Sequence, residues 1–182
     1  MYNCIKTFTK SIKSNDFIIF FFAGHGVQWG DRNFLLPCDN NQIETGNDMQ
    51  RFAINAQNMV NEMAAKNPHV VIFLLDCCRE YWMPKEGRSD GQSVGGLHEM
   101  KAPSGTLIAF ACAPGEVTPD RSLGSENGIF TKYLLKHITT PGIDVEHILR
   151  RVAKDIAQET KNKQQPFRVS SIYEENVCVV PA

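Results

Sequence analysis

The sequence predicts one α/β domain of three layers, in which helices flank a central, mostly parallel β-sheet. Three continuous apolar runs of strand length occur, at residues 17–22, 70–75 and 106–111. Continuous runs, unlike alternating ones, are typical of strands that are buried on both faces. Segments with the apolar spacing of amphipathic helices lie between and around these runs, and this alternation indicates a sheet covered by helices.

The elements of the first half follow in order. Residues 1–14 place Ile5, Phe8 and Ile12 on one helical stripe. The strand at 17–22 is expected to stop at a sharp glycine turn over residues 24–26. The polar segment 39–51 is predicted to be a loop, and residues 52–66 a helix that Asn67-Pro68 terminates.

The second half continues the same alternation. The strand at 70–75 leads into a long aperiodic segment, 80–103, and loops of this length are usually functional. After the strand at 106–111 come a polar loop, 113–127, and a helix over 128–137. Asp144 can cap a further helix, whose stripe includes Val145, Ile148 and Val152. A last strand is predicted at 177–180.

Length and composition suit one globular domain spanning residues 1–182. The chain is 42% hydrophobic and 21% charged. Its 19 basic and 20 acidic side chains leave a net charge of −1, which gives no electrostatic argument for a nucleic-acid or anionic-membrane partner. The apolar runs are also too short to cross a bilayer.

Six cysteines are present, and their arrangement favours free thiols. Cys77 and Cys78 are adjacent, the other four are scattered in apolar contexts, and no C-x-x-C pair suggests zinc. Reduced thiols indicate a cytoplasmic or nuclear setting, of which the cytoplasmic one is expected. No cofactor is indicated. Activation by calcium stays open, because several acids within 39–48 could bind a cation, although they do not form an EF-hand pattern.

Two candidate catalytic side chains follow neighbouring buried strands. His25 lies after the first strand, and Cys77 and Cys78 lie after the second. Parallel sheets bind ligands beyond the carboxyl ends of their strands, so the imidazole and a thiol are expected on one rim. A histidine can take the proton of a cysteine nucleophile near neutral pH. Either residue alone is more often structural, but the combination is rarer by chance.

Two motifs extend this pairing to a family resemblance. Gly24-His25-Gly26 and Leu75-Asp76-Cys77-Cys78-Arg79 resemble the motifs of the caspase, metacaspase and paracaspase group of cysteine peptidases. His25 and Cys78 are 53 residues apart, against about 50 in that family. Segments 34–39 and 126–135 are also similar to the family. The resemblance implies a caspase-like, Rossmann-like sandwich and hydrolysis of peptide bonds.

The resemblance also implies roles for individual residues. The family's nucleophile takes third place after Asp or Gln, which selects Cys78, with His25 as general base. Alternation along the strand would direct Cys77 away, toward the core. The N–H groups of Gly26 and Cys78 are expected to hold the oxyanion of the intermediate.

Substrate preference is predicted from the position two residues before Cys78. Caspases that cleave after Asp have Gln there, whereas Asp76 resembles metacaspases and paracaspases, which cut after Arg or Lys. A carboxylate in the pocket favours a cationic side chain. The alternative is that Asp76 only caps backbone amides nearby. By resemblance to the matching paracaspase loop, Asp120 is the next acidic candidate, followed by Glu116.

The sequence also departs from the family. A strand, a helix and a strand normally precede the element that opens this chain, so we expect an N-terminally incomplete domain. The strand at 17–22 would then expose an edge and an apolar face. This departure favours an alternative function, a catalytically weak or inactive scaffold that acts by protein–protein contact.

The sequence also leads to expectations about binding partners and about one alternative enzyme class. The expected partners are proteins or peptides with a basic residue before the cleaved bond. The family resemblance adds a possible homodimer through the strand at 177–180. An unrelated Rossmann-like enzyme is disfavoured, because no G-x-G-x-x-G or G-x-x-x-x-G-K-[ST] pattern opens a helix after a strand.

Overall fold

The computed structural model describes residues 1–39, 42–81, 99–113 and 127–182, with residues 78–81 described by their backbone alone. Within these ranges no helix has both the length and the apolar character needed to span a bilayer. The elements in chain order are α1 (Tyr2–Ser11), β1 (Phe17–Trp29), β2 (Arg32–Leu35), α2 (Gly46–Phe52), β3 (Ile54–Asn55), α3 (Ala56–Ala64), β4 (Val70–Tyr81), β5 (Thr106–Phe110), α4 (Ile129–His137), α5 (Val145–Glu159) and β6 (Phe167–Ser170).

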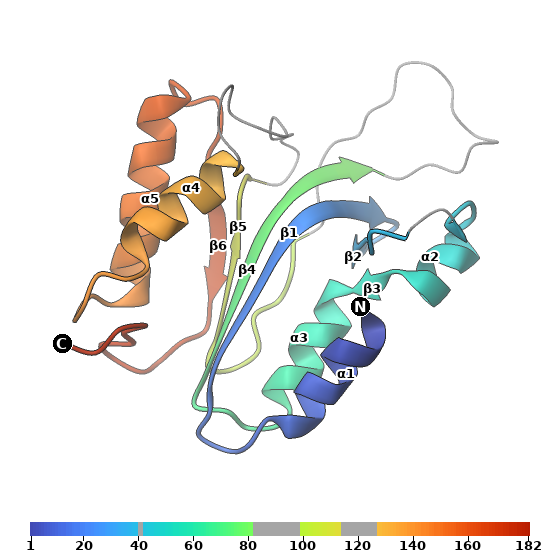
Figure 1. Ribbon diagram of the computed structural model, residues 1–182, viewed down its shortest axis with the longest axis horizontal. Helices are drawn as coiled ribbons and strands as arrows, with labels where there is room; N and C mark the ends of the chain where they lie inside the picture. Colours follow the sequence, from blue (N-terminus) through green and yellow to red (C-terminus); the bar gives the residue numbers. More distant parts are fainter. Residues whose placement is uncertain (40–41, 82–98, 114–126) are drawn as a thin grey trace.

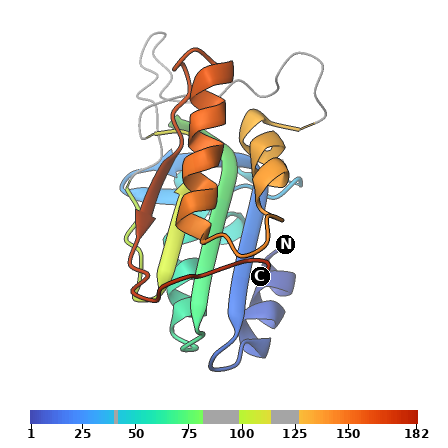
Figure 2. The ribbon, with the colours of Figure 1, turned by 90° about the vertical axis from the view of Figure 1, so that its left-hand side faces the viewer.

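The six strands form one sheet of order β3-β2-β1-β4-β5-β6. Its centre is parallel, because β4 pairs in parallel with both β1 and β5. The outer strands β2, β3 and β6 run antiparallel to their neighbours. Helices α1 and α3 cover one face and α4 and α5 the other (Figures 1 and 2). The predicted three-layer α/β fold is therefore confirmed.

The alternation of β4 divides its side chains between two cores. Its odd-numbered residues from Val71 to Cys77 are buried with side chains of α3 and the end of α1. Its even-numbered residues from Val70 to Leu74 are buried with those of α4 and α5. Because both faces of this strand are covered from Val70 to Leu75, its sequence over these residues is apolar without interruption.

Strand β1 is covered on one face only over its first half. Ile18 is buried, and Phe20 and Phe22 pack against the α1 and α3 core. On the other face Phe17, Ile19 and Phe21 are 38%, 38% and 43% exposed. Strand β2 pairs with β1 only over residues 26–29. The predicted exposure of an apolar face on this strand is confirmed.

Strands β1 and β4 extend further than the sequence predicts. No sharp turn occurs at Gly24-His25-Gly26, because β1 continues to Trp29. Hydrogen bonding to β2 holds this extension in the sheet, and the reversal between the two strands lies at Gly30, whose φ of +61° favours glycine. Strand β4 likewise runs on beyond Leu75 alongside β1.

Helix α2 was not predicted, since all of its residues except Phe52 fall in the expected polar loop; the helix predicted from residue 52 begins at Ala56 instead. Thr45 caps it: the Thr45 hydroxyl accepts from Asp48 N at 3.3 Å, and the Asp48 carboxylate accepts from Thr45 N at 2.9 Å. This reciprocal capping box stabilises a short polar helix that an apolar pattern alone does not reveal.

The predicted strand at 177–180 is wrong. Those residues form one isolated bridge, between Cys178 and Asp144, and Val177 is buried beside α5. The Asp144 carboxylate, predicted as a cap, accepts from Glu146 N at 2.8 Å and also from Val177 N at 2.9 Å. These bonds tie the segment to the start of α5. The edge of the sheet is β6 instead.

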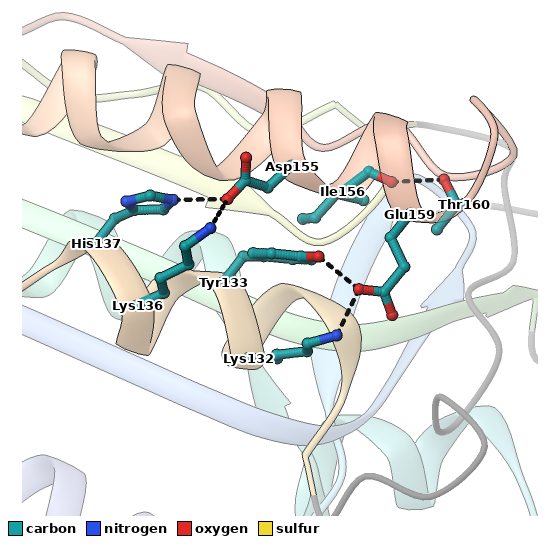
Figure 3. A network of polar contacts seen from close by, with 8 residues as sticks. All are labelled: Lys132, Tyr133, Lys136, His137, Asp155, Ile156, Glu159 and Thr160. Atoms are coloured by element: carbon teal, nitrogen blue, oxygen red, sulfur yellow. Dashed lines mark hydrogen bonds and ion pairs between the residues drawn. The ribbon is translucent and has the colours of Figure 1, made fainter.

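Helices α4 and α5 are joined by two carboxylates of α5 (Figure 3). Asp155 Oδ2 accepts from Lys136 Nζ at 2.6 Å and lies 2.9 Å from His137 Nε2. These contacts lower the pKa of Asp155 below its ordinary value of 3.8, and the contact with Lys136 has the largest effect. One turn later Glu159 accepts from Lys132 and from the hydroxyl of Tyr133. The contacts with Lys132 and Tyr133 lower the pKa of Glu159 below its ordinary value of 4.5.

The first prediction concerns the centre of the sheet. Phe73 is 0% exposed, and its ring stacks on that of Phe20 with centroids 4.6 Å apart. Phe73→Ala should lower the free energy of unfolding by about 3–5 kcal/mol, since it removes buried surface and leaves a cavity. Denaturant unfolding measures this. Leu135→Ala, at a position 58% exposed on α4, is the control and should stay within about 0.5 kcal/mol.

The second prediction concerns acid stability. A carboxyl whose pKa is lowered by folding stabilises the protein above its unfolded pKa, and that contribution disappears as the pH falls through the folded pKa. Asp155→Asn with Glu159→Gln should therefore destabilise the protein at pH 7. The difference from wild type should shrink between about pH 5 and pH 3. Urea unfolding across this range measures it, and a difference independent of pH would contradict it.

Candidate active site

The register between β1 and β4 brings the two predicted catalytic residues together. His25 is the Cα partner of Cys78, and a difference of 53 in residue number holds from Phe17 opposite Val70 to Gln28 opposite Tyr81. No bulge therefore interrupts the pairing before the site. Adjacent strands lie about 4.8 Å apart, so these residues are direct neighbours. His25 is exposed, and its carbonyl accepts from Leu36 N at 2.9 Å, which fixes the backbone.

The two adjacent cysteines differ in what surrounds them. Cys77 is 4% exposed and belongs to the core under α1 and α3. A thiol enclosed in this way is not reachable by a peptide substrate. Of Cys78 the backbone alone is described, and it lies in strand register with His25.

Gly26 lies in the middle of the sheet. It is buried and in register with Leu35 of β2 on one side and Arg79 of β4 on the other. The predicted oxyanion donors, the N–H groups of Gly26 and Cys78, are therefore on adjacent strands, one residue apart in register. Their role stays a prediction.

Asp76 is half-buried and reaches the N-terminus of α4. Its Oδ2 accepts from the backbone N of Thr131 at 3.1 Å and from the Thr131 hydroxyl. Sequence reasoning considered capping by Asp76 but missed Thr131 as the partner, 55 residues away. The available signal was Gly128, an N-cap residue that has no side chain to cap its own helix.

The remaining predicted substrate-binding residues, Asp120 and Glu116, lie outside the described residues. In the described part of the chain, no three His, Cys, Asp or Glu side chains are grouped as metal ligands would be. The described cysteines, at positions 4, 38, 77, 112 and 178, form no disulfide bond with one another.

A depression of about 600 Å³ lies at the opposite rim of the sheet. Asn15, His69 and Gly105, which precede β1, β4 and β5, are among its lining residues. Parallel sheets bind ligands at the carboxyl ends of their strands, and this depression is at the amino ends. The depression is therefore a weaker candidate for the active site than the rim at which His25 and Cys78 lie.

Similarity to known proteins agrees with this geometry. Residues 1–177 match the caspase domain family, peptidase family C14. The chain is 26% identical over 186 aligned residues to the human "Mucosa-associated lymphoid tissue lymphoma translocation protein 1", and 25% identical to its mouse homolog. Each alignment covers 100% of this chain and 21% of the relative, so the chain spans about a fifth of these proteins.

Two solved structures share the fold. The structure of pro-sf-caspase-1 aligns with a TM-score of 0.60 at 14% identity, over 100% of this chain and 72% of that one. Protein GSU0716 from Geobacter sulfurreducens aligns with a TM-score of 0.52 at 14% identity, over 98% and 77%. Taken with the family match over nearly the whole length, these findings show that the chain belongs to the caspase domain family of peptidases.

Proposed function

We propose that this chain is a cysteine endopeptidase that cleaves peptide bonds after Arg or Lys, with His25 as general base and Cys78 as nucleophile. The observation that supports this most is the uninterrupted β1–β4 register, which makes these two residues neighbours on adjacent strands. Membership of the caspase domain family supports the same chemistry. The buried position of Cys77 leaves Cys78 as the candidate of the adjacent pair.

The reaction follows from these two groups. The His25 imidazole accepts the proton of the Cys78 thiol, and the thiolate attacks the carbonyl carbon of the peptide. As the C–N bond breaks, the imidazolium returns its proton to the leaving amine, and a thioester remains. Water, deprotonated by His25, then attacks the thioester, releases the carboxylic acid and regenerates the thiol. The N–H groups of Gly26 and Cys78 would hold the oxyanion in both steps.

The preference for a basic residue rests on acidic side chains near Cys78. Asp76 is two residues away, and its carboxylate is held at the N-terminus of α4. A fixed carboxylate pairs with a guanidinium or an ammonium group of the substrate. Asp120 and then Glu116 are the further acidic candidates for this pocket. The substrates proposed are therefore proteins or peptides with Arg or Lys before the cleaved bond.

A catalytically weak scaffold is the second candidate function. Phe17, Ile19 and Phe21 present an exposed apolar face on β1, which favours contact with another protein chain. A homodimer formed by pairing at the C-terminal edge of the sheet would use β6, since residues 177–180 are not a strand. Described cysteines that form no disulfide bond with one another suit a reducing, cytoplasmic location.

The third prediction tests the reaction and its preference together. Fluorogenic peptides that differ only in the residue before the bond, Arg in one and Asp in the other, are assayed with wild type and with Cys78→Ala. Cleavage of the Arg peptide should exceed that of the Asp peptide and should vanish in Cys78→Ala. Cleavage of the Asp peptide alone would overturn the role of Asp76. A folded wild-type chain that cleaves neither would support the scaffold.

The fourth prediction separates the two adjacent cysteines. An Arg-mimicking, thiol-directed electrophile should label wild type and Cys77→Ala, but not Cys78→Ala. Mass spectrometry of peptides from the labelled protein identifies the modified residue. Cys77→Ala is the matched control, because it removes the neighbouring thiol with a small loss of buried volume. Labelling at Cys77 in the folded protein would contradict the assignment.

A further inference from the structure

Asp76 caps helix α4 from a position 55 residues before Thr131 in the sequence, much farther away than an ordinary capping residue. The capping side chain usually belongs to the N-cap residue itself. Here the N-cap residue is Gly128, which has no side chain to make a capping bond. The carboxylate of Asp76 on β4 fills that place instead, and receives both the N–H and the hydroxyl of Thr131.

Gly128 makes room for this contact. A Cβ atom at position 128 would lie 2.8 Å from Asp76 Oδ2 and 3.3 Å from Oδ1. The backbone does not require glycine there, since φ is −57° and ψ is 156°. The small residue is therefore explained by the approach of the carboxylate. A capping side chain at 128 would occupy the same space.

Thr131 fixes the carboxylate from two directions. Its N–H and its hydroxyl converge on one oxygen, so rotation of the carboxylate would break both bonds at once. Helix α4 is in turn tied to α5 by the Asp155 and Glu159 contacts (Figure 3). The orientation of Asp76 thus depends on the position of a helix that is itself held in place.

We propose that Thr131 is a positioning residue for substrate selection: it orients the Asp76 carboxylate toward a basic side chain, and Gly128 provides the space for it. This inference rests on the proposed function, in which Asp76 pairs with Arg or Lys of the substrate. Thr131 does not touch the substrate in this arrangement. Its effect is on the discrimination between charged and uncharged side chains, not on the chemistry at Cys78.

The test compares two peptides of nearly equal shape, one with Arg before the cleaved bond and one with citrulline. The ratio of their kcat/KM values reports the contribution of the positive charge and is independent of the fraction of active enzyme. Thr131→Val removes the hydroxyl and keeps the N–H. The ratio should fall about tenfold, by analogy with the loss of one hydrogen bond to a charged group. Thr131→Ser should restore it.

Two further variants test whether Thr131 acts through the Asp76 carboxylate. Gly128→Ala keeps both donors but introduces the 2.8 Å contact with Asp76 Oδ2, so the ratio should also fall. In an Asp76→Asn background, Thr131→Val should cause no further change, because its effect passes through the carboxylate. Thr160→Val is the matched control: it removes the hydroxyl of the α5 C-cap threonine, which donates to Ile156 O at 2.8 Å, and the ratio should stay that of wild type.

The outcomes separate the inference from the function on which it rests. If wild type prefers the Arg peptide and Thr131→Val lowers cleavage of both peptides equally, Thr131 is only a structural cap and the inference fails. If Thr131→Val also changes the ratio in the Asp76→Asn background, the effect does not pass through Asp76 and the inference fails. A wild-type chain that cleaves neither peptide would overturn the proposed function as well.

Discussion

The parallel pairing of β1 with β4 is the interaction on which the rest of the structure depends. It runs without a bulge from Phe17 to Gln28, and each residue of β1 lies opposite the residue 53 positions later. His25 and Cys78 are separated by this same number, so the interval between the two motifs is the register of the sheet. A single bulge would place the two residues on opposite faces. The two motifs must therefore be 53 residues apart in sequence for His25 and Cys78 to be neighbours in this sheet.

The two helical layers contribute differently to this site. Helices α1 and α3 bury the face that contains Cys77, and so remove the second thiol from the rim. Helix α4 lies on the other face and binds Asp76 at its N-terminus. Contacts with α5 hold α4 in turn. One layer thus restricts which thiol is available, while the other orients the neighbouring carboxylate.

The sequence allowed the layers and the central strands to be predicted, because continuous apolar runs and helical stripes follow directly from burial. It did not reveal where β1 ends, since two glycines suggested a turn, and pairing with a later strand decided otherwise. Helix α2 depends on a polar capping box and β6 on a short alternating segment, both weaker signals than an apolar run. Val177 and Val179 resemble a strand but pack beside α5. Thr131 was missed because its partner Asp76 is 55 residues away, and Gly128 was only an indirect signal of a cap from elsewhere.

The exposed half of β1 has a consequence for the behaviour of the chain in solution. From Phe17 to Gly24 this strand carries no charged residue, and natural edge strands rely on charge, proline or bulges to repel identical strands. The surface that favours self-association is therefore separate from the two buried cores that hold the fold together. Turbidity should rise steeply with protein concentration well below the melting temperature. A lysine at an outward position such as Ile19 would act as a gatekeeper without touching the buried face.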